Sequence, residues 1–293
     1  MTKKSKKSLL VGFIGQGFVG KNLADNFEHR GYKIVRYSLD KEYILNKDRL
    51  KECDLVFISV PTPTLPSGFD YSILNKVISL VGVGKIAVIK STIIPGTTAS
   101  LQKKNSSIIL LHSPEFLSEA SARHDTDNPF MNIIGMSQKS GKHLSAAKLA
   151  LSILPKAPFS LIVSNNESEL IKYAHNCSGF VQIVFFNILY DLAVKFKADW
   201  GNVYAALKAD PYIPNRYSNP VHKKGRGAGG RCFPKDFEAF IEVFSKILPK
   251  ELKSIGVLKN IREKNIELLV KSGKGIDLLQ AVYGKKIIKK YRH

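Results

Sequence analysis

The chain has 293 residues, of which 44% are hydrophobic and 24% charged, which is ordinary for a soluble protein and enough for two domains. Its formal net charge is +21, yet the basic residues are scattered, and no zinc-finger spacing or base-stacking motif argues for a nucleic-acid partner. Cys53, Cys177 and Cys232 are too few and too far apart for a disulfide framework, and no apolar run approaches the roughly 20 residues of a membrane span, so we expect a cytoplasmic protein without a signal peptide.

A buried strand is predicted over residues 9–14, and a glycine-rich turn follows it directly. A helix over residues 21–29 and a second strand over residues 33–37 come next. In this order a GxGxxG turn binds a dinucleotide, because its glycines permit the tight turn, the approach of the pyrophosphate and close packing of helix on strand. The predicted cofactor-binding residues here are Gly15, Gln16, Gly17, Phe18, Val19 and Gly20.

The residues after the second strand leave the choice of dinucleotide open. Asp40 could hold the ribose hydroxyls of NAD. Ser38, with Arg36 and Lys41 nearby, could instead accept the extra phosphate of NADP. We favour NAD.

Three further predicted strands, over residues 53–60, 85–90 and 107–111, end in small hydroxyl, proline or carboxylate residues. Later strands are predicted at 132–136 and 159–163, and helices at 71–81 and 140–154. Each such residue alone is more often a cap or loop residue. Because ligands bind outside the carboxyl ends of parallel strands, their recurrence at one edge predicts a shared crevice. The residues expected to face it are Thr62, Thr92, Glu115 and Glu119.

One long helix is predicted from residue 167 to about residue 197. Lys172 and Asn176, four residues apart, share one of its faces. Its run over residues 181–192 is apolar nearly all round, as in a core or a subunit interface, so we expect a homodimer through this helix. The predicted fold is α/β: a Rossmann-like doubly wound sheet over residues 1–165, an all-α central domain over 166–272 with the long connecting helix, and a basic tail over 273–293.

A glycine loop precedes a cysteine and a predicted helix over residues 237–247. Gly227, Gly229 and Gly230 leave the backbone free to approach a ligand, and Cys232, Lys235 and Asp236 follow within six residues of the last glycine. A cysteine beside a helix N-terminus and a lysine favours its thiolate, which is a nucleophile. Alone, this stretch is also consistent with a flexible loop and a buried cysteine.

Taken together, these motifs resemble the UDP-glucose/GDP-mannose 6-dehydrogenase family of nucleotide-sugar dehydrogenases. The matching pieces span about residues 9–265. They are the glycine turn, Val60-Pro61-Thr62-Pro63-Thr64, Ser91-Thr92, the segment from Pro114 to Ala120, the Lys172/Asn176 pair and the stretch from Gly227 to Asp236. Unrelated dehydrogenases share only the first piece, so the combination is specific.

The resemblance implies oxidation of the sugar C6 alcohol of UDP-glucose, or a related UDP-sugar, to the carboxylate of a uronate. Two hydrides go to NAD through a thiohemiacetal and a thioester on Cys232. Lys172 and Asn176 would transfer protons and stabilise oxyanions, and Glu115 would activate water through Thr92 or Asp236. Glu119 would lie against the nicotinamide and Lys235 near the cofactor. The cofactor would also contact Val60, Pro61, Thr62 and Pro63, and Ser91 and Thr92. The substrate would contact Glu115, Phe116, Leu117, Lys172, Asn176, Gly227, Gly229 and Gly230.

Two departures from the family pattern keep other functions in view. Tyr212 stands after Asp210-Pro211 where the family has arginine, and Arg216 is the expected substitute. The sequence also stops where the family's second, nucleotide-holding Rossmann-like domain would begin. The alternative is therefore a catalytically impaired nucleotide-binding or subunit-interaction relative. A two-electron hydroxyacid dehydrogenase ranks lower, because it has no use for Cys232.

Overall fold

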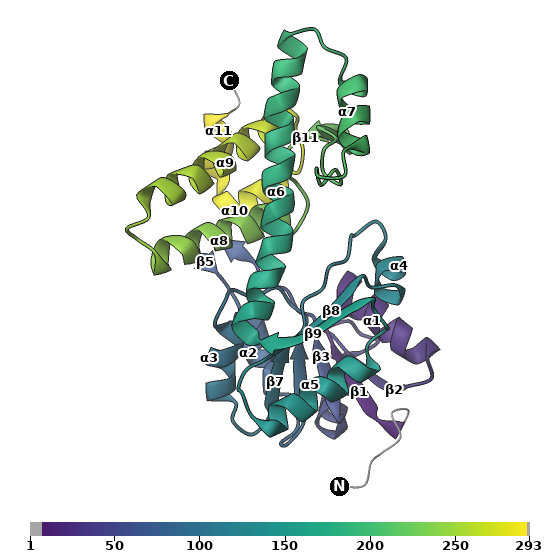
Figure 1. Cartoon of the computed structure of the whole chain (residues 1–293). Helices are drawn as coiled ribbons and strands as arrows, with labels where there is room; N and C mark the ends of the chain where they lie inside the picture. The colour runs from purple at the N-terminus through teal and green to yellow at the C-terminus, as the bar shows by residue number, and fades with distance from the viewer. Residues whose placement is uncertain (1–7, 292–293) are drawn as a thin grey trace. The chain divides into compact units, whose positions relative to one another are not determined.

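The computed structural model describes residues 8–291, and the chain divides into two compact units (Figure 1). Residues up to 62 and residues 70–172 form the first unit. Residues 63–69 and those from 173 onward form the second. The basic cluster at residues 3–7 and the final two residues of the predicted basic tail lie outside the described part of the chain.

The first unit is built on a seven-stranded sheet with the order β2-β1-β3-β6-β7-β8-β9. The strands are β1 (Leu10–Ile14), β2 (Lys33–Tyr37), β3 (Leu55–Ile58), β6 (Ile86–Ile89), β7 (Ile109–His112), β8 (Met131–Met136) and β9 (Phe159–Ser164). All neighbours run parallel except β7 and β8, so the sheet is mixed where we expected a parallel one. Because β8 runs opposite to β7, it begins at the edge of the sheet where β7 ends, and the segment between them starts and ends at that edge.

Helices cover this sheet on both faces because its central strands are apolar on both sides. Alternate residues such as Val11, Phe13 and Phe57 share one buried cluster with side chains of α1 and α5, and Phe13 stacks on Phe57 at 5.5 Å between ring centroids. The helices of the first unit are α1 (Phe18–His29), α2 (Ser72–Ile78), α3 (Thr97–Lys104), α4 (Ala122–Asp127) and α5 (Gly141–Ile153), with short 3-10 helices at Ile44–Asn46 and Asp48–Glu52.

The strand order reverses at β1, which lies between β2 and β3. The chain runs from β1 to β2 on one side and then crosses to β3 on the other. In open α/β sheets such a switch point opens a crevice at the carboxyl ends of the strands, where ligands bind. The turn at Gly15 and the segment after Ile58 are therefore expected at a binding edge.

The second unit is mainly helical. It contains most of α6 (Asn165–Lys195), then α7 (Trp200–Ala209), α8 (Phe233–Ile247), α9 (Leu252–Lys271), α10 (Ile276–Tyr283) and α11 (Lys285–Lys290). Two small hairpins pair β4 (Thr64–Leu65) with β5 (Gly68–Phe69) and β10 (Val221–His222) with β11 (Gly225–Arg226). Phe180 of α6 stacks on Phe237 of α8 at 4.0 Å, and Ile266, Leu269 and Leu279 form a second cluster.

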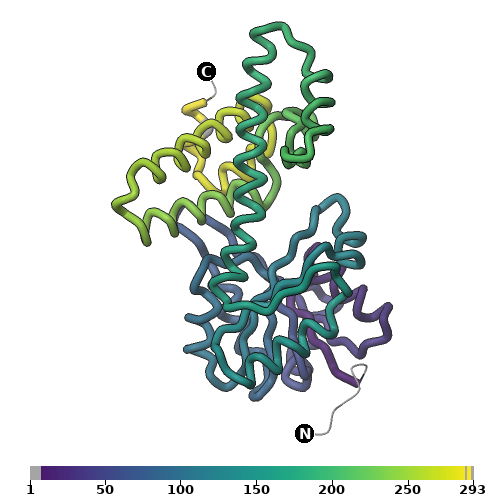
Figure 2. The backbone as a smooth tube through the Cα atoms, in the orientation of Figure 1, coloured from purple at the N-terminus to yellow at the C-terminus, as the bar shows by residue number. Residues whose placement is uncertain are grey.

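Helix α6 runs without a break over its whole length (Figure 2). By length and apolar composition it could cross a membrane, but a core helix of a soluble protein passes the same test. Phe180, Val184 and Phe186 of this helix are buried within the protein, as in a core helix. The predicted class, a Rossmann-like sheet domain followed by a helical domain with a long helix, is confirmed.

Candidate active site

The glycine turn after β1 has the three geometries that a dinucleotide requires. Gly15 has a φ of +89°, and a Cβ built on it would lie 2.2 Å from the Ser59 carbonyl oxygen. A Cβ on Gly20 would lie 1.9 Å from the carbonyl oxygen of Gly15, so α1 packs directly on the turn. A Cβ on Gly17 would meet nothing within 4 Å, which leaves open space in front of the N-terminus of α1. The turn therefore fits a pyrophosphate.

Hydrogen bonds join the loops that follow β3 and β6. The Val60 amide donates to Ser91 Oγ at 3.0 Å, and that hydroxyl donates to the Val60 carbonyl at 2.7 Å. Thr62 Oγ1 donates to the carbonyl oxygen of Thr92 at 2.6 Å. Two of the predicted cofactor segments thus lie together at the switch point. Pro61 is exposed there, whereas Pro63 belongs to the second unit.

An acidic residue stands at the end of β2, where the ribose of the adenosine half would lie. Ser38 Oγ donates to Asp40 Oδ2 at 2.7 Å, and both residues are solvent-accessible. Arg36, the basic candidate for an extra phosphate, pairs with Asp25 at 2.6 Å and Glu28 at 2.8 Å. Burial would lower the pKa of Arg36, but these two carboxylates raise it above its usual value. Because the positive charge of Arg36 is already paired with two carboxylates, the end of β2 suits the ribose of NAD better than the extra phosphate of NADP.

A buried ion pair joins the loop after β7 to the start of α6. Lys172 Nζ lies 3.0 Å from Glu115 Oε1 and donates to the Glu115 carbonyl at 2.6 Å, and the side chains are 3% and 8% exposed. Burial would raise the pKa of Glu115, but the charge of Lys172 and the amide of Leu117 outweigh it and hold the pKa below its usual range. The ring centroid of Phe116 lies 5.4 Å from Lys172 Nζ. The sequence predicted both residues as functional but not their direct pairing.

Thr92 and Glu119, which were also predicted at this edge of the sheet, are more exposed than Glu115. Thr92 is half-buried and carries the carbonyl that Thr62 binds, while Glu119 is exposed beyond the loop. Sequence reasoning missed Lys90, which precedes Ser91 and is buried beside this loop. A lysine directly after four apolar strand residues was the available signal.

In the second unit, Cys232 occupies the N-cap position of α8 and is partly exposed. Asp236, one turn into the helix, is 1% exposed, and it accepts a hydrogen bond from Asn176 Nδ2 at 2.6 Å. The Lys235 ammonium pairs with the other carboxylate oxygen of Asp236. Thr64, from the β4–β5 hairpin, donates to the Lys235 carbonyl at 2.9 Å. The predicted thiol, lysine and carboxylate therefore begin one helix, and Asn176 on α6 holds the carboxylate.

The glycine loop before Cys232 is held from one side by α9. Asn265 accepts from the Ala228 amide at 2.6 Å and donates to the Ala228 carbonyl at 3.0 Å. A Cβ on Gly227, whose φ is +88°, would lie 3.0 Å from Leu269 Cγ. Gly229 lies against Lys274, whereas Gly230 is exposed and a Cβ there would meet nothing. The loop is thus packed at its start and open near the cysteine.

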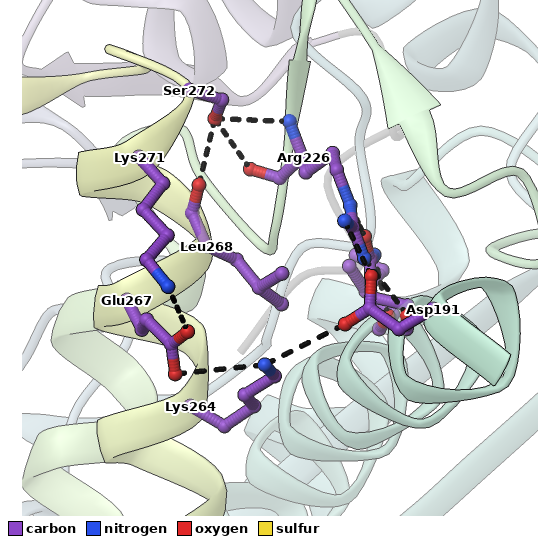
Figure 3. A network of polar contacts seen from close by, with 9 residues as sticks. Asp191, Arg226, Lys264, Glu267, Leu268, Lys271 and Ser272 are labelled. Carbon is purple, nitrogen blue, oxygen red and sulfur yellow. Dashed lines mark hydrogen bonds and ion pairs between the residues drawn. The ribbon is translucent and has the colours of Figure 1, made fainter. Parts of the chain in front are cut away.

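Arg226 fastens the start of this loop to α6 (Figure 3). Its guanidinium donates to the Asn187 side chain at 2.7 Å and pairs with Asp191 at 2.6 Å. Lys264 on α9 reaches the same Asp191 at 3.6 Å, and Ser272 Oγ accepts from the Arg226 amide at 3.1 Å. Sequence reasoning missed this network, because each of these four contacts joins residues 35 or more positions apart.

Arg216, the predicted substitute for the family arginine, is exposed on the loop between α7 and β10. Its guanidinium lies 5.8 Å from the centroid of the Tyr217 ring. Its role in substrate binding stays a prediction.

Comparison with known proteins gives the same family for both units. Residues 36–149 match the NAD binding domain of the UDP-glucose/GDP-mannose dehydrogenase family, and residues 166–265 match its central domain. UDP-glucose 6-dehydrogenase of Rickettsia prowazekii is 30% identical over 289 residues, which cover 88% of this chain and 65% of that protein. The chain thus spans just under two thirds of the length of this relative.

Solved structures show the same fold. A UDP-glucose dehydrogenase from Pyrobaculum islandicum has a TM-score of 0.77 and 25% identity, over 96% of this chain and 72% of that one. A UDP-D-ManNAc dehydrogenase from Pyrococcus horikoshii, at 20% identity, has a TM-score of 0.70 over 91% and 73% of the two chains. With the glycine geometry, the acidic ribose corner and both domain matches in agreement, the chain belongs to the UDP-glucose/GDP-mannose dehydrogenase family and carries its NAD-binding domain.

Proposed function

We propose that the chain is an NAD-dependent nucleotide-sugar 6-dehydrogenase, which oxidises the C6 alcohol of UDP-glucose or a related UDP-sugar to a carboxylate. The observation that carries the proposal is the thiol of Cys232 at the N-terminus of α8, one turn before the buried carboxylate of Asp236. A simple alcohol dehydrogenase needs no nucleophile, whereas oxidation of an aldehyde to an acid uses one.

The chemistry assigned to the chain's residues balances in four steps. The alcohol loses a proton and a hydride to become an aldehyde, and the Cys232 thiolate adds to its carbonyl carbon. The thiohemiacetal loses a second hydride to give a thioester, and water then displaces the thiol to leave the carboxylate. NAD, when bound, would accept one hydride in each oxidation, so two NAD molecules are consumed per sugar.

The polar residues around these steps receive roles that suit their chemistry. Lys172 and Asn176, on successive turns of α6, supply an ammonium and an amide, which are the donors that a developing oxyanion needs. Glu115, ionised beside Lys172, is suited to accept a proton from the hydrolytic water, with Thr92 or Asp236 as a relay. In the same proposal Glu119 and Lys235 serve the cofactor, and Arg216 and the three glycines of the loop hold the substrate.

NADH formation counted per sugar consumed tests the proposal. Two NADH per UDP-glucose, with Cys232→Ser forming no net acid, are expected. One NADH per sugar would indicate a two-electron dehydrogenase. No NADH with a panel of UDP-sugars, together with retained NAD binding, would favour a nucleotide-binding relative.

We further propose that the enzyme is a cytoplasmic homodimer. Phe185, Ile188 and Leu192 lie on one face of α6 at spacings of three and four residues, and they are 57%, 50% and 53% exposed. A stripe of large apolar side chains at this exposure is suited to burial against a second copy. The three cysteines are not joined by disulfides in the part of the chain that the structure describes, in keeping with a reducing compartment.

A further inference from the structure

Lys90 brings a second ammonium to the surroundings of Glu115. It directly follows β6, and only 8% of the residue is exposed. Its Nζ donates to Ser113 Oγ at 3.1 Å and to the Pro114 carbonyl at 3.2 Å. Both acceptors belong to the residues immediately before Glu115, and Ser113 is 1% exposed. The ammonium therefore fastens the backbone that presents the Glu115 carboxylate.

Burial disfavours the charged form of Lys90, and the nearby Glu115 carboxylate favours it. Burial lowers the pKa of Lys90 to about 8, with Glu115 acting to raise it and Lys172 to lower it. His112, the other titratable neighbour, adds no charge at neutral pH, because burial and Lys90 lower its pKa to about 3. Glu115 thus faces two ammonium groups, one in contact and one acting through space.

Neither hydrogen bond of Lys90 needs a charged donor, since a neutral amide would satisfy a hydroxyl and a carbonyl equally well. A buried ammonium at this position costs desolvation that an apolar side chain would avoid. Its distinctive contribution is positive charge next to a carboxylate that must stay ionised in a buried place.

We propose that Lys90 is a positioning residue that fixes the turn carrying Glu115 and keeps its carboxylate ionised. The inference deepens the proposed function, because it assigns to Lys90 the control of the group that activates water there. Lys90 itself touches neither substrate nor cofactor in this scheme.

The titration of Glu115 in the full chain tests the inference without any substrate. The protein is labelled with glutamate carrying 13C at the carboxyl carbon, and Glu115→Gln identifies the resonance. In Lys90→Met the midpoint of Glu115 should move to higher pH, whereas Lys90→Arg, which keeps the charge, should retain the wild-type midpoint. An unchanged midpoint in Lys90→Met, or an equal shift in Lys90→Arg, overturns the proposal.

Should Lys90→Met fail to fold, Lys90→Gln decides. Its neutral amide can still donate to Ser113 Oγ and the Pro114 carbonyl but carries no charge, so it should also move the Glu115 midpoint upward, and an unchanged midpoint would again overturn the proposal. In turnover, Lys90→Met should move the acidic limb of kcat to higher pH, with KM little changed.

The two proposals fail separately. A chain that forms no NADH, but whose Glu115 titration depends on Lys90, contradicts the proposed function alone. Two NADH per sugar with a titration indifferent to Lys90 contradict the role of Lys90 alone.

Discussion

Gly17 and Gly20 differ in what a side chain would meet, although they stand three residues apart in one turn. A Cβ on Gly20 would lie 1.9 Å from a carbonyl oxygen, and one on Gly17 would meet no atom within 4 Å. The first glycine therefore serves the ligand and the second serves the packing of α1. The GxGxxG spacing predicted both roles, because the turn geometry is local to the motif.

This difference predicts opposite effects of two alanine substitutions. Gly17→Ala should leave the melting temperature unchanged and weaken NAD binding by about tenfold, because its methyl group stands where the pyrophosphate approaches. Gly20→Ala should lower the free energy of unfolding by about 2 kcal/mol, since the backbone must move. Calorimetric titration with NAD and thermal denaturation check the pair. Wild-type NAD affinity in Gly17→Ala would contradict the assigned role.

The choice between NAD and NADP depends on contacts that the sequence alone does not reveal. Ser38, Asp40 and Arg36 occur close together in the sequence, which favours NAD but leaves NADP open. The ranking comes from Asp25 and Glu28 on α1, which occupy the guanidinium of Arg36. Such a partnership depends on how a helix packs beside a strand, and the sequence pattern does not carry it.

Helices and strands with a long, regular hydrophobic pattern could be predicted from the sequence. A helix whose N-terminus is capped by a residue far away in the chain could not. The strand at residues 33–37 and the long helix followed from apolar runs and periodicity. Helix α3 was missed, because its N-terminus is capped by Glu169 of α6. That buried carboxylate accepts from the amides of Gly96 at 2.6 Å and Thr98 at 2.9 Å. A cap some 70 residues away leaves no local signal.

The contacts of Arg226 with α6 are expected to stabilise the glycine loop. Arg226→Leu removes the hydrogen bonds to Asn187 and the ion pair with Asp191, so it should cost about 1–2 kcal/mol of unfolding free energy. It should also speed amide hydrogen exchange of the loop around Ala228. Urea denaturation and hydrogen exchange with mass spectrometry measure the two effects.

Lys271→Met is the matched control within the same network (Figure 3). Its ion pair with Glu267 joins neighbouring turns of α9, and the lysine side chain is 59% exposed. Such a pair contributes less than about 0.5 kcal/mol. Equal effects of the two substitutions would show that Arg226 does not hold the loop.

At the scale of the whole molecule, the sequence predicted two domains but not which segments build each one. Residues 63–69 form a hairpin of the second unit, although the chain on both sides of them belongs to the first. Thr64 is bound to Lys235, a residue far along the chain, and only the folded structure shows such a contact. Residues 273–291, predicted as part of a tail, include α10 and α11, with Leu279 in the core cluster. These two helices, which follow Gly275 and Gly284, are 8 and 6 residues long, which is too short for a helical hydrophobic periodicity to be evident in the sequence.

The proposed dimer predicts that a single charge on the outer face of α6 separates the two copies. Ile188→Glu places a charge in the middle of the exposed stripe of α6, where a partner surface would have to desolvate it. The wild-type chain should have twice the chain mass in size-exclusion chromatography with light scattering, and the variant the mass of one chain. Leu252→Glu is the control, because Leu252 is equally apolar and 74% exposed but lies on α9. It should leave the dimer intact. A wild-type chain that stays monomeric at micromolar concentration would contradict the dimer, and α6 would then be a core helix whose outer face contacts only water. A dimer that survives Ile188→Glu would place the subunit contact elsewhere on the chain.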